Sequence, residues 1–315
     1  MTELAGTVTV TVPKGRIAWL EERRLGIQAS DAPVILGLAP WSSPYKLWLD
    51  KTGKLPIEEE AEPSLRLRMG HAAEPEIATE FATRRNVTLY DLGDYAIARS
   101  TEHPHLGATF DRLLVDDPEL APRGREFWTA PVEFKTVAGN REEWTDTEPS
   151  AYALVQLTHQ MIVGNFDHGY IAAALDFGAG YLDYEIPVND DLRDLLLEEE
   201  YRFWQLIKSD TPPAVDGSTA TRQALRALYP QDSGREIELA GEEWGRKLEA
   251  WRAAKEKVAE AEAERDRLVA EFQAAMGDAT KAIIPGVGAL SWKTASRKGY
   301  YVQPSTTRTF REVKL

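Results

Sequence analysis

Two runs of mixed apolar and polar residues in the middle of the chain predict a pair of neighbouring strands. The first is Leu106–Leu114 and the second is Pro131–Thr136, with a turn-rich segment between them. Side chains alternate between the two faces of a strand, so Glu133 and Lys135 share one face and the apolar residues beside them share the other. If the two strands pair, Asp111 can meet Glu133 and Lys135 on that polar face.

Apolar residues at helical spacing predict helices on both sides of these strands in the chain. Ala29–Asp31 is a capping signal before a short apolar run, and Gly37 is expected to end that helix. The segment Met69–Phe81 carries an apolar stripe, and we expect its helix to begin at Pro75, because proline fits the first turn of a helix. Strands and helices in this order indicate an α/β fold.

A third helix is predicted over Tyr152–Gly164 from apolar residues three or four apart. Gln156 and Gln160 lie four residues apart and therefore share one face of this helix. We interpret Gln160 as an exposed side chain. His159 is interpreted as a structural histidine with its hydrogen bonds satisfied, which is commoner than a metal ligand.

The C-terminal part of the chain predicts a long helix followed by short strands. Glu242–Met276 lacks proline and has apolar residues near a heptad spacing, so it needs a partner surface. Gly277 is expected to close this helix. Ala289–Lys293 and Thr309–Lys314 read as strands.

These patterns divide the chain into three parts. We expect a core domain over residues 1–217, a linker over 218–241 that is briefly helical, and a C-terminal extension over 242–315. The extension is predicted to be helical with short strands.

Asp111, Glu133 and Lys135 are the candidate chemical group of this core. Two carboxylates on rigid strands suit a hard, oxygen-seeking cation such as Mg²⁺, and a nearby ammonium can orient water or stabilise an oxyanion. Such a trio fits metal-assisted phosphodiester hydrolysis. The alternative is a solvated strand face with a weak ion pair, which is common for an isolated Glu-x-Lys.

Composition excludes sites that need cysteine, and the negative net charge is unusual for a DNA-binding protein. The 315 residues contain no cysteine, so disulfides, thiolate zinc sites and iron–sulfur clusters are excluded. The first twenty residues have no apolar run, and we expect a cytoplasmic enzyme without a signal peptide or a membrane span. The net charge of −14 is unusual for a DNA-binding protein, although residues 291–315 hold six Lys or Arg against one Glu.

The spacing of Asp111 and the Glu-x-Lys of Glu133 and Lys135 resembles the P-D…(D/E)-x-K nuclease superfamily. More closely, the chain resembles the YqaJ-like viral recombinases, which are related to the phage lambda exonuclease family. Further matches are Gly70-x-x-x-Glu74-Pro and the glutamine at Gln156 in its predicted helix. The resemblance covers about Leu20 to Pro213. It implies a restriction-endonuclease-like α/β core with a central mixed sheet flanked by helices.

The resemblance also implies roles for individual residues. One or two Mg²⁺ ions, with Mn²⁺ as a substitute, would be held by Glu74, Asp111, Glu133 and the backbone carbonyl of Phe134. Lys135 would orient or help deprotonate the attacking water, and Gln156 would position that water or the scissile phosphate.

A separate group is implied at the N-terminal side of the core. By resemblance, Arg24 and Ser30 would bind the 5′-phosphate of a DNA end, with Arg23 as the alternative arginine and helix capping as the alternative role of Ser30. The insertion between the two central strands offers Arg123, Arg125 and Trp128 for DNA contacts, against the alternative of a packed tryptophan.

The implied activity is 5′→3′ exonuclease digestion of linear double-stranded DNA, which leaves 3′ overhangs for recombination. Implied partners are DNA ends, a single-strand annealing protein and further copies of the chain in a trimeric ring. Two other functions stay open: an endonuclease of low sequence preference on the same fold, and a DNA-binding or assembly module without catalysis.

Overall fold

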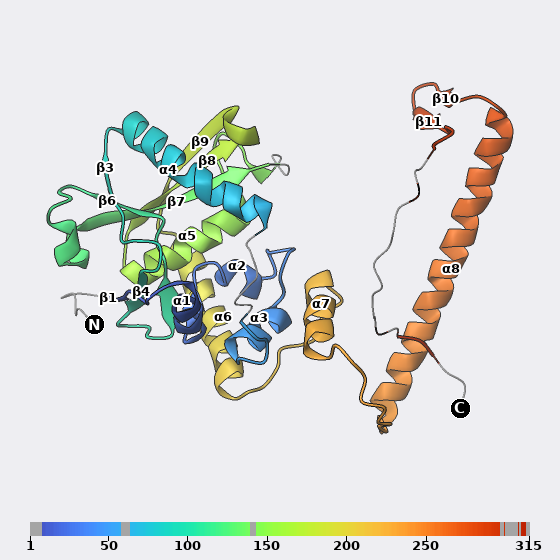
Figure 1. Ribbon diagram of the computed structural model, residues 1–315, viewed down its shortest axis with the longest axis horizontal. Helices are drawn as coiled ribbons and strands as arrows, with labels where there is room; N and C mark the ends of the chain where they lie inside the picture. Colours follow the sequence, from blue (N-terminus) through green and yellow to red (C-terminus); the bar gives the residue numbers. More distant parts are fainter. Residues whose placement is uncertain are drawn as a thin grey trace. The chain divides into compact units, whose positions relative to one another are not determined.

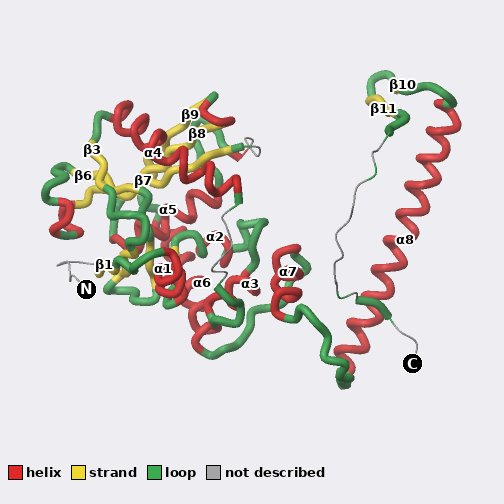
Figure 2. The backbone as a smooth tube through the Cα atoms, viewed as in Figure 1, coloured by secondary structure: helices red, strands yellow, loops and turns green. Residues whose placement is uncertain are grey.

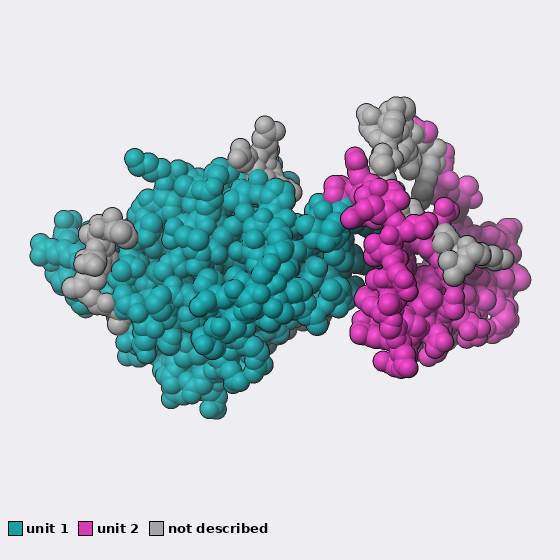
Figure 3. All heavy atoms as spheres, turned by 90° about the horizontal axis from the view of Figure 1, so that it is seen from below, with its two compact units in different colours: residues 1–229 teal, residues 230–315 magenta. Residues whose placement is uncertain are grey.

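The computed structural model describes residues 8–57, 64–138, 143–296, 299, 308 and 310–312. The chain forms two compact units, residues 1–229 and residues 230–315 (Figure 3).

Within the described residues, five strands of the first unit form a mixed sheet in the order β3-β6-β7-β8-β9 (Figure 1). Only β7 and β8 are parallel, and the other neighbours are antiparallel. The strands are β3 (Thr88–Tyr90), β6 (Arg112–Val115), β7 (Trp128–Val137), β8 (His168–Leu175) and β9 (Gly180–Pro187). The β6–β7 pair confirms that the two runs predicted as neighbouring strands do pair.

Helices α4 (Leu65–Arg85) and α5 (Ala151–Gly164) cover opposite faces of this sheet. On the α4 side, Phe81 packs edge-on against Phe134, with ring centroids 6.3 Å apart. On the α5 side, Leu157 and Ile171 belong to the main apolar core and are fully buried. The predicted mixed sheet flanked by helices is therefore confirmed.

A smaller sheet in the same unit has the order β1-β4-β5-β2. Figure 2 draws all strands in yellow. Its strands are β1 (Val8–Thr11), β2 (Ile27–Gln28), β4 (Ile97–Ser100) and β5 (Leu106–Ala108). The run expected as one strand over Leu106–Leu114 is thus two strands, β5 and β6, in different sheets. Asp111 lies where the chain passes from one sheet to the other.

The remaining helices of the first unit surround the smaller sheet and α5. They are α1 (Arg16–Arg24), α2 (Ala32–Ile35), α3 (Pro44–Lys51), α6 (Asp190–Lys208) and α7 (Thr219–Leu228). Helix α7 packs on α3 through a hydrogen bond of 2.7 Å between Ser43 and Thr221. Because Ala220 and Ala224 are also buried there, the first unit extends beyond the boundary predicted at residue 217.

The prediction that a helix begins at Pro75 is wrong. Helix α4 begins at Leu65, and Ser64 caps it by accepting a hydrogen bond from the Leu67 N–H at 3.3 Å. Pro75 lies inside this helix and is exposed. A proline in a helix interior costs about 3 kcal/mol, but the buried stripe that includes Phe81 anchors the helix to the sheet. Tertiary packing therefore overrides the local preference.

The second unit contains α8 (Glu242–Met276) and an antiparallel hairpin of β10 (Lys281–Ile284) and β11 (Gly288–Ser291). The bounds of α8 match the prediction, and Gly277 follows it with φ 55°. Strand β10 was not predicted. The strand expected over Thr309–Lys314 is not found in the described residues 310–312, and its other residues lie outside the described ones. No helix among the described residues has the length and apolar character needed to cross a membrane.

Candidate active site

Asp111 is held against the edge of β7 at the point where its neighbour β6 begins. The pairing of β6 with β7 starts at Arg112, opposite Val132, so β7 extends past the end of its partner. The N–H of Phe134 on this free edge donates a hydrogen bond to Asp111 Oδ2 at 2.8 Å. In a strand, the N–H and C=O of one residue point to the same edge. The carbonyl of Phe134 therefore faces the side of Asp111.

Glu133 is the buried centre of the polar face of β7, with only 2% of its surface exposed. Its Oε1 accepts hydrogen bonds from Lys135 and, at 2.6 Å, from the Gln156 amide. Its Oε2 accepts a hydrogen bond of 2.5 Å from Gln160. A carboxylate is stable in such a place only when its charge and lone pairs are matched. One ammonium and two amides match them here.

Lys135 completes this network on the same face of β7. Its Nζ donates to Gln156 Oε1 at 3.0 Å and lies 5.6 Å from the centre of the Tyr152 ring. Burial opposes the charged form, but the attraction of Glu133 outweighs it and raises the pKa of Lys135 above its ordinary value. The ammonium thus stays charged. Of the two roles considered for Lys135, this favours orienting water and stabilising negative charge over removing a proton.

The prediction that Gln160 is exposed is wrong. Its side chain is fully buried and donates to Glu133, while its own Oε1 has no hydrogen-bond partner among the described residues. The error arises because α5 is covered by the large sheet on one side and by α2 and α6 on the other. The spacing of Gln156 and Gln160 was the available signal, since it places both amides on one helix face.

Asp111 and Glu133 repel each other across the site. The pKa of Asp111 is raised well above its ordinary value, first by burial and then by the negative charge of Glu133. The positive charge of Lys135 lowers this pKa, and the carboxylate of Glu74 raises it further. The pKa of Glu74 is raised as well, mainly by burial and against the pull of Arg112. Glu74 and Arg112 form an ion pair of 3.4 Å. A positive ion among these carboxylates would relieve the repulsion.

The donor groups fit a hard cation in kind. In the part of the chain that the structure describes, no three His, Cys, Asp or Glu side chains are already arranged as a metal-ligand cluster. Two carboxylates, Asp111 and Glu133, together with the carbonyl of Phe134 supply oxygen ligands of the type that Mg²⁺ prefers. Glu74 on α4 is close enough to Asp111 and Glu133 for their charges to interact, but its carboxylate accepts a hydrogen bond from Arg112.

Comparison with known proteins assigns the chain to a family. Residues 18–167 match the YqaJ-like viral recombinase domain. The chain is also 31% identical over 284 residues to the uncharacterised protein YqaJ of Bacillus subtilis (strain 168), covering 88% of this chain and 83% of that one. The chain belongs to the YqaJ-like family. The matched region begins in α1 and ends just after α5, so it contains every residue discussed as a candidate for the site.

Solved structures with some likeness to this YqaJ-like chain include two exonucleases. An alkaline exonuclease from Laribacter hongkongensis is 14% identical, with a TM-score of 0.47, and the match covers 62% of this chain and 94% of that one. A phage-related exonuclease from Haemophilus somnus 129PT is 14% identical, with a TM-score of 0.40, covering 61% and 99%.

The two arginines considered for the 5′-phosphate of a DNA end have different partners in this YqaJ-like core. Arg24 is bound to Asp50 at 2.7 Å and to the carbonyl of Leu55 at 2.8 Å. Arg23 instead donates to Ser30 at 2.8 Å. The structure therefore brings Ser30 together with Arg23, the alternative arginine, and not with Arg24.

Behind the network, His159 is held by two acceptors and serves a structural role as predicted. Its Nδ1 lies 2.6 Å from Glu200 on α6, and its Nε2 lies 2.9 Å from the carbonyl of Gly107 on β5. Both ring nitrogens must donate when both partners accept, so the ring is an imidazolium. His159 and Glu200 are fully buried. The ion pair of His159 with Glu200 connects α5 to α6, and the hydrogen bond to Gly107 connects α5 to β5, the strand that precedes Asp111.

The insertion between β6 and β7 is used for packing. Trp128 is buried and donates from Nε1 to the carbonyl of Ala121 at 2.9 Å, which confirms the packed alternative. Arg125 donates to the carbonyl of Asn165 at 3.0 Å and lies over the Phe166 ring at 3.6 Å. It is thereby engaged at the C-terminal end of α5.

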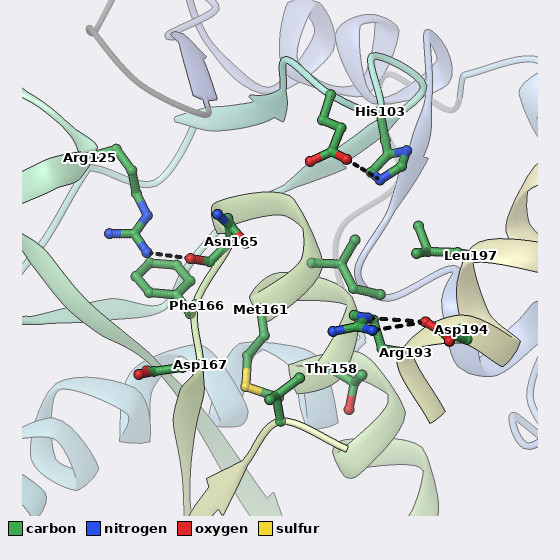
Figure 4. A pocket seen from close by; sticks show the side chains of 13 residues that line it. His103, Arg125, Thr158, Met161, Asn165, Phe166, Asp167, Arg193, Asp194 and Leu197 are labelled. Atoms are coloured by element: carbon green, nitrogen blue, oxygen red, sulfur yellow. Dashed lines mark hydrogen bonds and ion pairs between the residues drawn. The ribbon is translucent and has the colours of Figure 1, made fainter. Parts of the chain in front are cut away.

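A pocket of about 760 Å³ lies beside this end of α5 (Figure 4). Arg125, Met161 and Phe166 line one part of it, and Arg193 with Asp194 from α6 lines another. The carboxylates of the polar network do not line it. It is therefore separate from the candidate active site.

Proposed function

We propose that this protein is a Mg²⁺-dependent exonuclease that degrades linear double-stranded DNA from its 5′ ends. The observation that carries the proposal is the network of Asp111, Glu133, Lys135 and Gln156, with Glu133 buried at its centre, in a chain of the YqaJ-like viral recombinase family. A fully matched carboxylate next to a carboxylate of raised pKa is an arrangement that suits cation binding rather than simple packing.

The metal would be held by Asp111, Glu133 and the carbonyl of Phe134, with Glu74 as a further ligand. When bound, Mg²⁺ supplies charge for the phosphate and lowers the pKa of bound water. The residues of the chain do the rest. Asp111 is oriented by the backbone of β7.

Lys135 and Gln156 have complementary parts in this proposal. The Lys135 ammonium stabilises the negative charge that develops on the phosphate as the bond to water forms. Gln156 bridges Lys135 and Glu133, so it holds both side chains at fixed positions. Its amide is suited to aligning the attacking water or the scissile phosphate for in-line cleavage, which leaves a 5′-phosphate on the product.

Recognition of the 5′ end would fall to Ser30 and a neighbouring arginine. The contact between Arg23 and Ser30 favours Arg23 over Arg24, whose guanidinium is engaged with Asp50. This group adjoins α2, which packs on α5 through Ala32 and Val155. A 5′-phosphate bound there would lie next to the helix that carries Gln156.

The resemblance supports further parts of the proposal. The products would be 3′ overhangs that a single-strand annealing protein uses in recombination, and the chain would act as a homo-oligomer, a trimeric ring in the related family. The basic residues near the C-terminus are suited to contacts with DNA phosphates, in contrast to the acidic remainder of the chain.

The test is digestion of a linear duplex that carries a 5′-phosphate and a label on each strand. We expect loss of the 5′-ended strand in Mg²⁺ and none in EDTA, with a closed circle left intact. Lys135→Ala should abolish digestion, whereas Lys208→Ala, at the exposed last turn of α6, should leave it unchanged.

Other results would select the other functions. Nicking of the closed circle would identify an endonuclease. DNA binding without cleavage under any divalent metal would identify a binding module. Loss of the 3′-ended strand first would contradict the proposed polarity.

A further inference from the structure

Helix α8 carries a continuous seam of positions spaced alternately four and three residues apart, as in a coiled coil. The apolar members of the seam are Trp244, Leu248, Trp251, Val258, Val269, Phe272 and Met276. Three charged residues, Lys255, Glu262 and Arg265, fall in the same row. A helix of 35 residues is stabilised mainly by burying such a seam, so the seam calls for a partner.

The chain itself covers the seam at two residues, whereas Trp244 and Leu248 are 43% and 42% exposed. Near the start, Trp251 meets the ring of Phe310 edge-on, with centroids 5.7 Å apart, and Arg252 pairs with Glu312. At the other end, Met276 is buried.

The middle of the seam is open. Val258 is 58% exposed, Val269 is 44% exposed and Phe272 is 43% exposed in the described structure. From Lys255 to Phe272 the open part is about 27 Å long, at about 1.5 Å per residue. This stretch has the length of a short coiled-coil contact.

The charged residues of the seam decide which partner fits. In a parallel pair of identical helices each seam residue meets its own copy, so Lys255, Glu262 and Arg265 would all meet like charges. An antiparallel pair can have its two-fold axis between Ala263 and Glu264. Glu262 then meets Arg265 of the second copy, and by symmetry Arg265 meets Glu262 of the second copy. Buried charges are tolerated when they are paired in this way.

The same antiparallel register matches the other seam residues. Val258 then meets Val269 of the second copy, and Lys255 meets Phe272, over which its alkyl stem can lie with the ammonium at the edge. The seam is flanked by small residues such as Ala259 and Ala261, which allow close approach of two helices. Every residue in the open part of the seam thus finds a complementary partner in a second copy of itself.

We propose that α8 pairs with α8 of a second copy of this chain, antiparallel, with Glu262 and Arg265 forming reciprocal ion pairs at its centre. This self-association goes beyond the proposed nuclease function and does not rest on it. It is also distinct from a trimeric ring, because an antiparallel helix pair has two-fold symmetry.

The chain contains no cysteine, so introduced thiols can report the register in the full-length protein. Val258→Cys and Val269→Cys are made separately, and each is oxidised alone and as an equimolar mixture. Since a disulfide needs Cα atoms within about 7 Å, the mixture should give at least about tenfold more covalent dimer than either variant alone. Circular dichroism on each variant checks that the helix is kept.

Charge exchange gives the matched control. In the mixture background, Glu262→Arg should abolish the cross-link, since it places four arginines at the centre of the pair. The combined change Glu262→Arg with Arg265→Glu should restore it, because the reciprocal pairs are re-formed with opposite sign.

Two outcomes would overturn the proposal. Self-cross-linking of Val258→Cys as efficient as that of the mixture would mean a parallel pair. Absence of any cross-link in a protein of unchanged helicity would mean that another surface covers the seam.

Discussion

Helices α5 and α8 show opposite relations between polar residues and their surroundings. Helix α5 is enclosed on several sides, and its Gln160 and His159 are fully buried. Each of them donates to a carboxylate, Gln160 to Glu133 and His159 to Glu200. Helix α8 is much longer, yet of its described residues only Met276 is buried. Its ion pairs, such as that of Arg267 with Glu264, are exposed.

A reactive site is expected where polar groups of this chain are buried. A polar group that is buried must be matched by hydrogen bonds or charge, so its position is fixed and its pKa can shift. The polar groups along α8 are exposed to water, so their positions within this chain are not fixed in the same way. The buried amide of Gln160 on α5 therefore points to a site, whereas the open seam of α8 points to an interface.

The largest expected effect is that of removing a carboxylate from the network around α5. Glu133→Gln removes the charge that holds Lys135 and the two glutamine amides, and Asp111→Asn removes its counterpart. We expect each to lower the rate of DNA digestion by at least about 10³-fold, as for the loss of a key electrostatic group. The rate of digestion is measured as the loss of the labelled strand from an end-labelled duplex.

A matched control for this prediction is Glu119→Gln, which changes an exposed glutamate between β6 and β7 and should keep full activity. Thermal unfolding of each variant separates loss of chemistry from loss of fold. Full activity of Glu133→Gln in a folded protein would remove Glu133 from the site.

The next effect concerns the ion pair behind α5. Glu200→Gln removes the negative charge that faces the buried His159 imidazolium at 2.6 Å. Breaking a buried pair by removing one partner costs about 3–5 kcal/mol, so the free energy of unfolding should fall by about that amount in urea denaturation. Glu198→Gln, whose side chain is 67% exposed on the same helix, should have little effect. Equal stability of the two variants would mean that the pair contributes nothing.

Gln160 should show a smaller effect on activity. Gln160→Leu removes the donor to Glu133 Oε2 without leaving a buried polar atom at position 160. Groups that orient a metal ligand from outside typically contribute about 10–100-fold to metal affinity or activity, and we expect a loss in that range. Because Gln160→Leu leaves Asp111 in place, raising the Mg²⁺ concentration should recover part of the rate. No change in either the rate or the Mg²⁺ dependence would assign Gln160 a purely structural role.

The sequence predicted these two helices with different success. The bounds of α8 followed from a heptad pattern without proline, since local signals suffice for a helix that contacts little else. The burial of Gln160 could not be predicted, because it depends on α2, α6 and the sheet, which come from distant parts of the chain. The start of α4 was placed at Pro75 for a similar reason, as the packing that keeps a proline inside a helix leaves no local signal.

The candidate site shows the same limit. Asp111, Glu133 and Lys135 were found together because strand alternation and pairing are readable from the sequence. The choice between Arg23 and Arg24 for Ser30 was not readable, since neighbouring residues of a helix differ only in which side they face. Long-range contacts such as that of Arg24 with Asp50 decide it.

The pair behind α5 should also make stability depend on pH. Burial disfavours the charged ring, but Glu200 outweighs it and raises the pKa of His159 above its ordinary value. The charged form of His159 is therefore favoured by folding. The contribution of the charged His159 ring to folding stability is complete below the ordinary histidine pKa of about 6.5. It is lost as the pH rises through the raised pKa of His159.

The difference in unfolding free energy between the wild type and Glu200→Gln should accordingly shrink as the pH is raised above that range. Among the described residues, further titratable groups that act on or are acted on by His159 include Asp31, which also favours its charge, and His105, whose pKa is lowered to about 4, chiefly by burial. His105 is thus neutral in this range. A difference that grows with pH would contradict the assignment of an imidazolium.

The smallest effect is expected for the exposed ion pairs of α8, which sharpens the contrast with His159 and Glu200. Arg267 pairs with Glu264 and Glu271 along the helix surface, and all three side chains are more than half exposed. Water and salt screen such pairs, and ordering two long side chains offsets the attraction. Arg267→Ala should therefore leave the melting temperature unchanged within error at physiological salt. A clear drop for Arg267→Ala, absent for the equally exposed Arg202→Ala on α6, would show that this surface of α8 is covered in solution.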